Sequence, residues 1–113
     1  MNKQSNLGEF EILVLAALIR LGDDAYGVTI RNEIEKRAER LVSVGALYST
    51  LARLEEKNYV TSNIGGATAE RGGRAKRYYQ ICPLGQERLE KSIRALNSML
   101  VDMSPTSAAP IVR

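Results

Sequence analysis

The sequence predicts an α+β fold that is mostly α-helical: a winged helix-turn-helix with an added C-terminal helix for dimerisation. Three apolar patterns at helical spacing occupy roughly the first half of the chain. Two short strand patterns joined by a glycine-rich segment follow, and a fourth helical pattern begins at Pro83. We therefore expect a winged-helix domain over residues 1–81, a dimerisation helix over residues 82–103 and a disordered tail over residues 104–113.

The first helix is predicted from Asn6, which forms a weak capping-box pattern with Glu9, to about Leu21. Its apolar residues lie on two sides, and a helix that is apolar nearly all round must be buried nearly all round. One side is expected to face the core of the domain. The other side is expected to be covered by a second subunit, and it consists of Ile12, Leu15 and Ile19.

Two further helices are predicted before the strands. Asp24 is a good N-cap for a helix over residues 25–39, and Ser43 is a good N-cap for the next helix, over residues 44–57. An apolar stripe that ends at Leu54 would fix this third helix on the core. The opposite side is small and polar near its start, whereas an ordinary surface helix would carry more Lys and Glu there. This side consists of Gly45, Ser49, Ala52 and Arg53, with Ala46 and Tyr48 at its borders.

The remaining elements are a β-hairpin and the last helix. Strands are predicted over residues 59–64 and 74–81, joined by a flexible loop over residues 65–73. Pro83 suits the first position of the last helix. The apolar residues of this helix recur with spacings of 4, 3, 4 and 3, a heptad-like seam that we expect to form dimer contacts. The seam consists of Leu89, Ile93, Leu96, Leu100 and Met103.

The composition excludes several classes of protein. One Cys and no His exclude an internal disulfide framework and a zinc site built from Cys and His, and we expect no cofactor. Cys82 is expected to be a small buried residue, with a redox sensor as the alternative. No spacing of possible catalytic side chains indicates an enzyme. The longest apolar run, residues 12–19, is too short to span a membrane. Glu9 and Glu11 flank it and no small-residue cleavage site follows, so it is not a signal peptide and we expect a cytoplasmic protein.

Positive charge is concentrated in the second half of the chain. The net charge is +3, yet residues 57–113 carry nine Lys and Arg against four Asp and Glu, and four of these cations lie within residues 71–77. A basic hairpin behind three helices is typical of a winged helix that binds duplex DNA, with its third helix in the major groove and its hairpin on the phosphates or the minor groove. The candidate DNA contacts are Ser43, Gly45, Ala46, Tyr48, Ser49, Arg53, Arg71, Arg74, Lys76 and Arg77.

Three stretches of the sequence resemble the PadR family of transcriptional regulators. They are Ala25–Gly27 with Ile30 and Arg31, then Val44–Tyr48 with Leu51–Glu55, and Gly72–Tyr79 with Gly85 beyond it. The resemblance covers about residues 7–90 and points to the compact subfamily with one C-terminal dimerisation helix. One departure is Cys82, where the family usually has Thr; a thiol caps poorly, so a weaker start of the last helix is expected.

The resemblance implies a homodimer, built through the first and last helices, in which the helix of Tyr48 reads DNA and residues 74–77 form the wing. It also implies a repressor that a small-molecule effector releases from DNA. Two recognition helices related by a twofold axis would meet one face of DNA about 34 Å apart, so we expect an inverted-repeat operator. The main alternative is a winged-helix module for protein contacts without DNA binding. An enzyme and an RNA-binding protein are weaker alternatives, the latter because no pair of aromatic residues stands on an open sheet.

Overall fold

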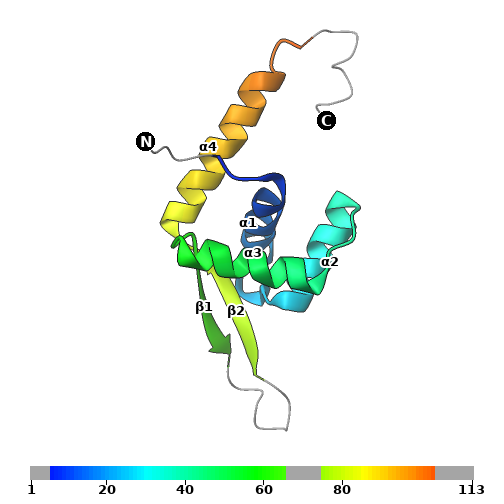
Figure 1. The fold of residues 1–113 in the computed structure, drawn as a ribbon, viewed down its shortest axis with the longest axis vertical. Helices are drawn as coiled ribbons and strands as arrows, with labels where there is room; N and C mark the ends of the chain where they lie inside the picture. Colours follow the sequence, from blue (N-terminus) through cyan, green and yellow to red (C-terminus); the bar gives the residue numbers. More distant parts are fainter. Residues whose placement is uncertain (1–5, 66–74, 104–113) are drawn as a thin grey trace.

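The computed structural model describes residues 6–65 and 75–103, and it confirms the predicted fold class (Figure 1). Four α-helices, one 3-10 turn and a two-stranded antiparallel sheet make up these ranges. The predicted loop tip and the predicted tail lie outside them. In chain order the elements are α1 (Glu9–Leu21), η1 (Gly22–Asp24), α2 (Gly27–Ala38), α3 (Val44–Glu56), β1 (Val60–Gly65), β2 (Lys76–Ile81) and α4 (Pro83–Leu100).

The core forms around α1, which contacts α2, α3, α4 and β2. Every other helix and both strands contribute at least one buried apolar side chain to the same cluster, so the described residues share one core. In Figure 1, α3 crosses α1, while the hairpin and the second half of α4 project from this body in opposite directions. The best-buried side chains are Val14, Leu15, Ile30, Leu47, Leu51 and Leu54.

The third helix begins where the sequence predicts. Ser43 has extended backbone angles, and its side-chain oxygen accepts a hydrogen bond from the backbone N–H of Ala46 at 3.1 Å. This bond satisfies one of the N–H groups that the first turn of a helix leaves without a partner. The start of α3 is therefore set by local chemistry as well as by packing.

Replacing Ser43 by alanine is expected to lower the free energy of unfolding by about 1 kcal/mol, because the N–H of Ala46 loses its acceptor. Chemical denaturation of the two proteins checks this value. Ser98→Ala is the matched control, since Ser98 is exposed on α4 and should change the free energy of unfolding by less than about 0.5 kcal/mol. Equal effects of the two substitutions would contradict the capping role.

The first two helices begin two or three residues later than predicted. At α1 the N–H of Gly8 donates to the Glu11 carboxylate at 2.8 Å, so the predicted capping pair Asn6 and Glu9 is wrong. At α2 the predicted Asp24 cap is also wrong, because Asp24 lies in the 3-10 turn. There the Thr29 hydroxyl oxygen accepts a hydrogen bond from the N–H of Tyr26 at 3.0 Å and closes the first turn.

The hairpin has the predicted antiparallel pairing, with Val60 opposite Ile81 and Gly65 opposite Lys76. It is also attached to the start of α2. The N–H of Tyr79 donates to the carbonyl of Ala25 at 2.9 Å, and an isolated bridge joins the next residue, Tyr26, to Tyr78. The base of the hairpin is therefore held by the segment that precedes α2.

The last helix has Pro83 in its first turn, as predicted, and Cys82 at its N-cap position makes no side-chain capping bond. The helix ends at Leu100, earlier than predicted. Asp102 adopts a left-handed backbone conformation with φ of 66°, so Met103 follows a turn and does not extend the helical seam. Within the described ranges, no helix is both long and apolar enough to cross a membrane.

Candidate nucleic-acid interface

The outward side of α3 is made of small, uncharged side chains. Leu47, Leu51 and Leu54 are buried and fix the opposite side of the helix on the core. Apart from Tyr48 at one edge, two turns of exposed helix surface thus carry no long side chain and no charge between the N-cap and Arg53. The predicted contacts Gly45, Ala46 and Ser49 are all exposed on this surface, together with Ala52.

Arg53 lies at the edge of this surface instead of standing out from it. One guanidinium nitrogen is 3.8 Å from the Glu11 carboxylate of α1, and it donates to the hydroxyl of Thr50 at 3.5 Å. Half of the Arg53 side chain is exposed, but its guanidinium group lies on the side of α1, near Glu11. The helical spacing groups Arg53 with Gly45 and Ser49; it cannot include Glu11, which is distant in the sequence.

Tyr48 lies at the other edge of α3, on the side of the hairpin. It shares this side with Glu55, two turns later, and the Glu55 carboxylate accepts a hydrogen bond from the Ser62 hydroxyl of β1 at 2.9 Å. The hydroxyl end of Tyr48 reaches the start of α2, where it lies over Gly27. Tyr48 is 45% exposed, so part of the residue is open to a ligand.

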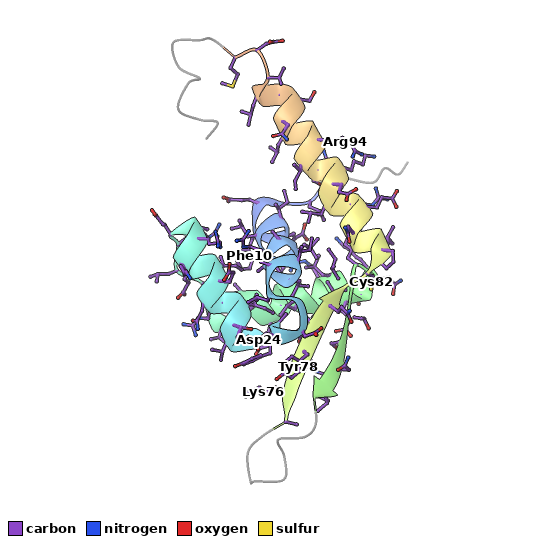
Figure 2. All side chains as sticks on the ribbon, turned by 180° about the vertical axis from the view of Figure 1, so that it is seen from behind. Phe10, Asp24, Lys76, Tyr78, Cys82 and Arg94 are labelled. Atoms are coloured by element: carbon purple, nitrogen blue, oxygen red, sulfur yellow. The ribbon has the colours of Figure 1, made fainter. Side chains whose placement is uncertain are left out.

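The two described cations of the hairpin have different surroundings. Arg77 donates to the Ser62 hydroxyl at 3.0 Å, and Ser62 in turn donates to Glu55, so the charge of Arg77 is partly compensated through this chain. Lys76 points to the other face of the hairpin, where its ammonium group lies 4.9 Å from the ring centre of Tyr26. Figure 2 shows Lys76 and Tyr78 on the hairpin near the turn at Asp24. Arg71 and Arg74, the other two predicted wing contacts, lie outside the described residues.

Tyr79 anchors the hairpin from its inner face. Its side chain is nearly fully buried against the core, and burial raises the pKa of its hydroxyl above the ordinary value. Tyr79 therefore remains a neutral packing residue at physiological pH. Lys76 and Arg77 are exposed on the same short strand, β2. The buried Tyr79 ring therefore anchors the strand that carries these two cations.

A second surface is apolar and lies between the start of α1 and the second half of α4. It forms a groove of about 650 Å³, lined by apolar side chains from both helices. On the same helix, Ile93 and Leu100 are also partly exposed, and Leu96 is 53% exposed. Among the lining residues of the groove are Leu7, Ile12, Leu13, Ala95, Leu96 and Met99.

Two residues predicted to form dimer contacts do not reach this surface. Leu15 has no exposed area and Leu89 is 4% exposed, because both side chains pack into the core of their own protomer. The prediction that Leu15 lies on an outer side of α1 is therefore wrong. Ile19 is exposed, yet it is not among the residues that line the groove. Met103 is partly exposed beyond the end of α4.

The described residues hold no group of three or more His, Cys, Asp and Glu that could bind a metal ion. Several of their ionisable side chains form ion pairs on the surface. The Arg37 and Arg20 guanidinium groups both contact the Glu33 carboxylate and lower its pKa below the ordinary value. The Arg20–Glu33 pair ties α1 to α2, whereas Arg37 and Glu33 both lie on α2. The α3 surface, the hairpin and the apolar groove remain as the candidate sites.

Comparison with known proteins identifies the fold. The chain is similar to a transcriptional regulator from Clostridium thermocellum, with 27% identity and a TM-score of 0.67 over 79% of this chain and 81% of that one. It is similar to a PadR family transcription regulator from Clostridium difficile, with 27% identity and a TM-score of 0.70 over 81% and 91%. A PadR-like transcription factor from Bacteroides fragilis has 26% identity and a TM-score of 0.65 over 80% and 85%.

No curated protein sequence matches the chain. The family profile described as "Transcriptional regulator PadR-like family" matches residues 14–91, which span most of α1, the whole hairpin and the first half of α4. This range contains the α3 surface and both strands, and the members of the family are transcription regulators rather than enzymes. The chain therefore belongs to the PadR-like family of transcriptional regulators.

Proposed function

We propose that the protein is a homodimeric repressor that binds an inverted-repeat operator in duplex DNA and is released from it by a small-molecule effector. The observation that carries the proposal is the exposed, uncharged surface of α3 beside a basic hairpin. The major groove admits one α-helix, and small side chains allow the helix backbone to approach base edges closely. The family membership of the chain supports a regulator that acts on DNA.

The surface of α3 would contact base edges, and the hairpin would contact phosphates. Ser49, near the middle of the exposed surface, offers a hydroxyl to base edges, and Gly45 leaves room at the start of the helix. Lys76 would contact a phosphate, since the described residues place no carboxylate within ion-pair distance of it. Arg53 and Arg77 would contribute less, because Glu11 and Glu55 already compensate part of their charge.

The dimer is proposed from the apolar groove between α1 and α4. The second half of α4 extends past the rest of the protomer with apolar side chains exposed along it (Figure 1). The occupant we propose is α4 of a second copy, because a C2 arrangement pairs each exposed helix with the groove of its partner. An exposed apolar surface of this kind is otherwise costly in water.

An effector would bind in the part of this groove that α4 of the second copy leaves open. In one protomer the whole groove has a volume of about 650 Å³, within the usual range of pockets for small molecules. Its lining is mostly aliphatic, so the effector is expected to be an apolar molecule that is held by shape more than by hydrogen bonds. Binding there would change the contact between α1 and α4, and with it the spacing of the two copies of α3.

A binding measurement tests the proposed function. Labelled genomic fragments and a random-sequence duplex are titrated with the protein at several salt concentrations. We expect binding that weakens steeply with salt for both, with a tighter specific class among the genomic fragments. Failure to bind any duplex at low salt would contradict DNA binding and favour the alternative, a winged-helix module for protein contacts.

The hairpin makes a separate prediction. Lys76→Ala is expected to weaken binding to all DNA sequences alike and to lower the salt slope by about 1.8 per dimer, since each phosphate contact contributes about 0.9. Arg77→Ala is the matched comparison, and its smaller change follows from the chain Arg77–Ser62–Glu55. An unchanged salt slope in the Lys76→Ala protein would exclude a phosphate contact at this position.

A further inference from the structure

The contact between Tyr48 and Gly27 joins α3 to the start of α2. A Cβ atom placed on Gly27 would overlap the Tyr48 hydroxyl oxygen and would lie 2.8 Å from the ring carbon that carries it. Gly27 is buried and begins a regular helix, so its backbone does not require glycine. Glycine is also a poor helix former. Its presence is explained by the space that the Tyr48 ring needs.

The same segment also touches the hairpin. Tyr26 precedes Gly27, and its ring packs edge-on against the Tyr78 ring, with 5.3 Å between ring centres. The ammonium group of Lys76 also lies near the Tyr26 ring, and the carbonyl of Ala25 accepts a hydrogen bond from β2. Residues 25–27 therefore contact both the helix proposed to read DNA and the hairpin proposed to bind phosphates.

The position of Tyr48 favours contact with the DNA backbone over contact with bases. Its ring is turned away from the outward surface of α3 and toward α2, yet 45% of its area is exposed. A tyrosine hydroxyl is a common donor to phosphate oxygens, and such contacts fix the register of a protein on the duplex. A ring held in one place would perform this task without losing conformational freedom on binding.

We propose that Gly27 is a positioning residue, which holds the Tyr48 ring against the start of α2 so that its hydroxyl contacts a phosphate and sets the register of α3 in the major groove. This inference rests on the proposed function. It assigns a role in DNA binding to a buried glycine that contacts no DNA itself, and it removes Tyr48 from the residues that read bases.

A double-mutant cycle tests the proposal. Gly27→Ala is expected to weaken binding to one fixed duplex about tenfold, because the Tyr48 ring must swing away from the phosphate that it contacts. Tyr48→Ala should weaken binding by the same factor, and the double variant should bind no more weakly than either single variant. Effects that multiply to about a hundredfold would overturn the proposal, since Gly27 would then act independently of Tyr48. Binding of Gly27→Ala at the wild-type level would also overturn it.

The fold is expected to tolerate these changes. The atom that meets the new Cβ is the end of a half-exposed side chain, and alanine is the better helix former, so the denaturation midpoint of Gly27→Ala should be no lower than that of the wild type. The NMR signals of the Tyr48 ring provide a readout without DNA. They should shift in Gly27→Ala but not in Gly45→Ala, because a Cβ on Gly45 meets nothing within 4 Å.

The two readouts separate the failure of this proposal from the failure of the proposed function. Unchanged Tyr48 ring signals in Gly27→Ala would overturn the positioning role, whether or not the protein binds DNA. A wild-type protein that binds no duplex would overturn the proposed function and, with it, the phosphate contact. The ring signals would still decide whether Gly27 positions Tyr48.

Discussion

Replacing Ile93 and Leu96 by glutamate is expected to convert the protein from dimers into monomers and to lower operator affinity at least about a hundredfold. Both side chains are partly exposed on one side of α4 in the protomer, 39% for Ile93 and 53% for Leu96, so the change should leave the protomer folded. In the proposed dimer, however, it would bury unpaired carboxylates against the apolar groove. The affinity falls because a monomer reaches only one half-site.

Sizing by analytical ultracentrifugation at micromolar concentration, followed by DNA titration, measures both effects. Ser98→Glu is the matched control, because Ser98 is exposed on the opposite side of α4 and should leave dimerisation and DNA binding unchanged. A circular dichroism spectrum shows that the variant remains folded. A wild type that sediments as a monomer, or a double variant that remains a dimer, would contradict the proposed interface.

Ser49→Glu is expected to reduce binding to every duplex at least about a hundredfold without unfolding the protein. Ser49 is exposed in the middle of the uncharged surface of α3, so a carboxylate there would face the phosphates and base edges of the groove. The milder Ser49→Ala should instead change which sequences are preferred, by about 1–3 kcal/mol for each hydrogen bond to a base that the serine hydroxyl no longer makes.

The same Ser98→Glu protein serves as the control, because it carries the same change in charge on a helix far from α3. Fluorescence anisotropy with one labelled duplex compares the affinities of the wild type, Ser49→Glu and Ser98→Glu. The surface of α3 would be excluded as the reader if Ser49→Glu bound DNA as tightly as the control. The helix would then be free to serve a protein partner.

The sequence is sufficient to predict the elements whose signals are local. Ser43 caps α3, and Pro83 opens α4, because each depends on a single residue next to the helix. The hairpin follows from alternating strands around a glycine-rich loop. The uncharged surface of α3 also follows from the sequence, since the stripe of leucines defines which side of the helix is exposed.

Interactions between distant residues account for what the sequence could not predict. The periodicity of α1 identifies two apolar sides but not which neighbour covers each, so it predicts an outward position for Leu15, which is completely buried. Arg53 turns toward α1 because Glu11 lies there. The Gly27–Tyr48 contact depends on how α2 and α3 cross, and no spacing in the sequence determines that angle.

Selection of binding sites from a pool of random duplex DNA tests the central claim most directly. Sequences retained by the wild-type protein should converge on an inverted repeat whose half-site centres are roughly 10 base pairs apart, or a multiple of that distance. The Ile93→Glu/Leu96→Glu variant should enrich single half-sites or nothing. A pool in which no sequence is enriched by the wild type, or only an unpaired half-site, would contradict a dimer that reads DNA with two copies of α3.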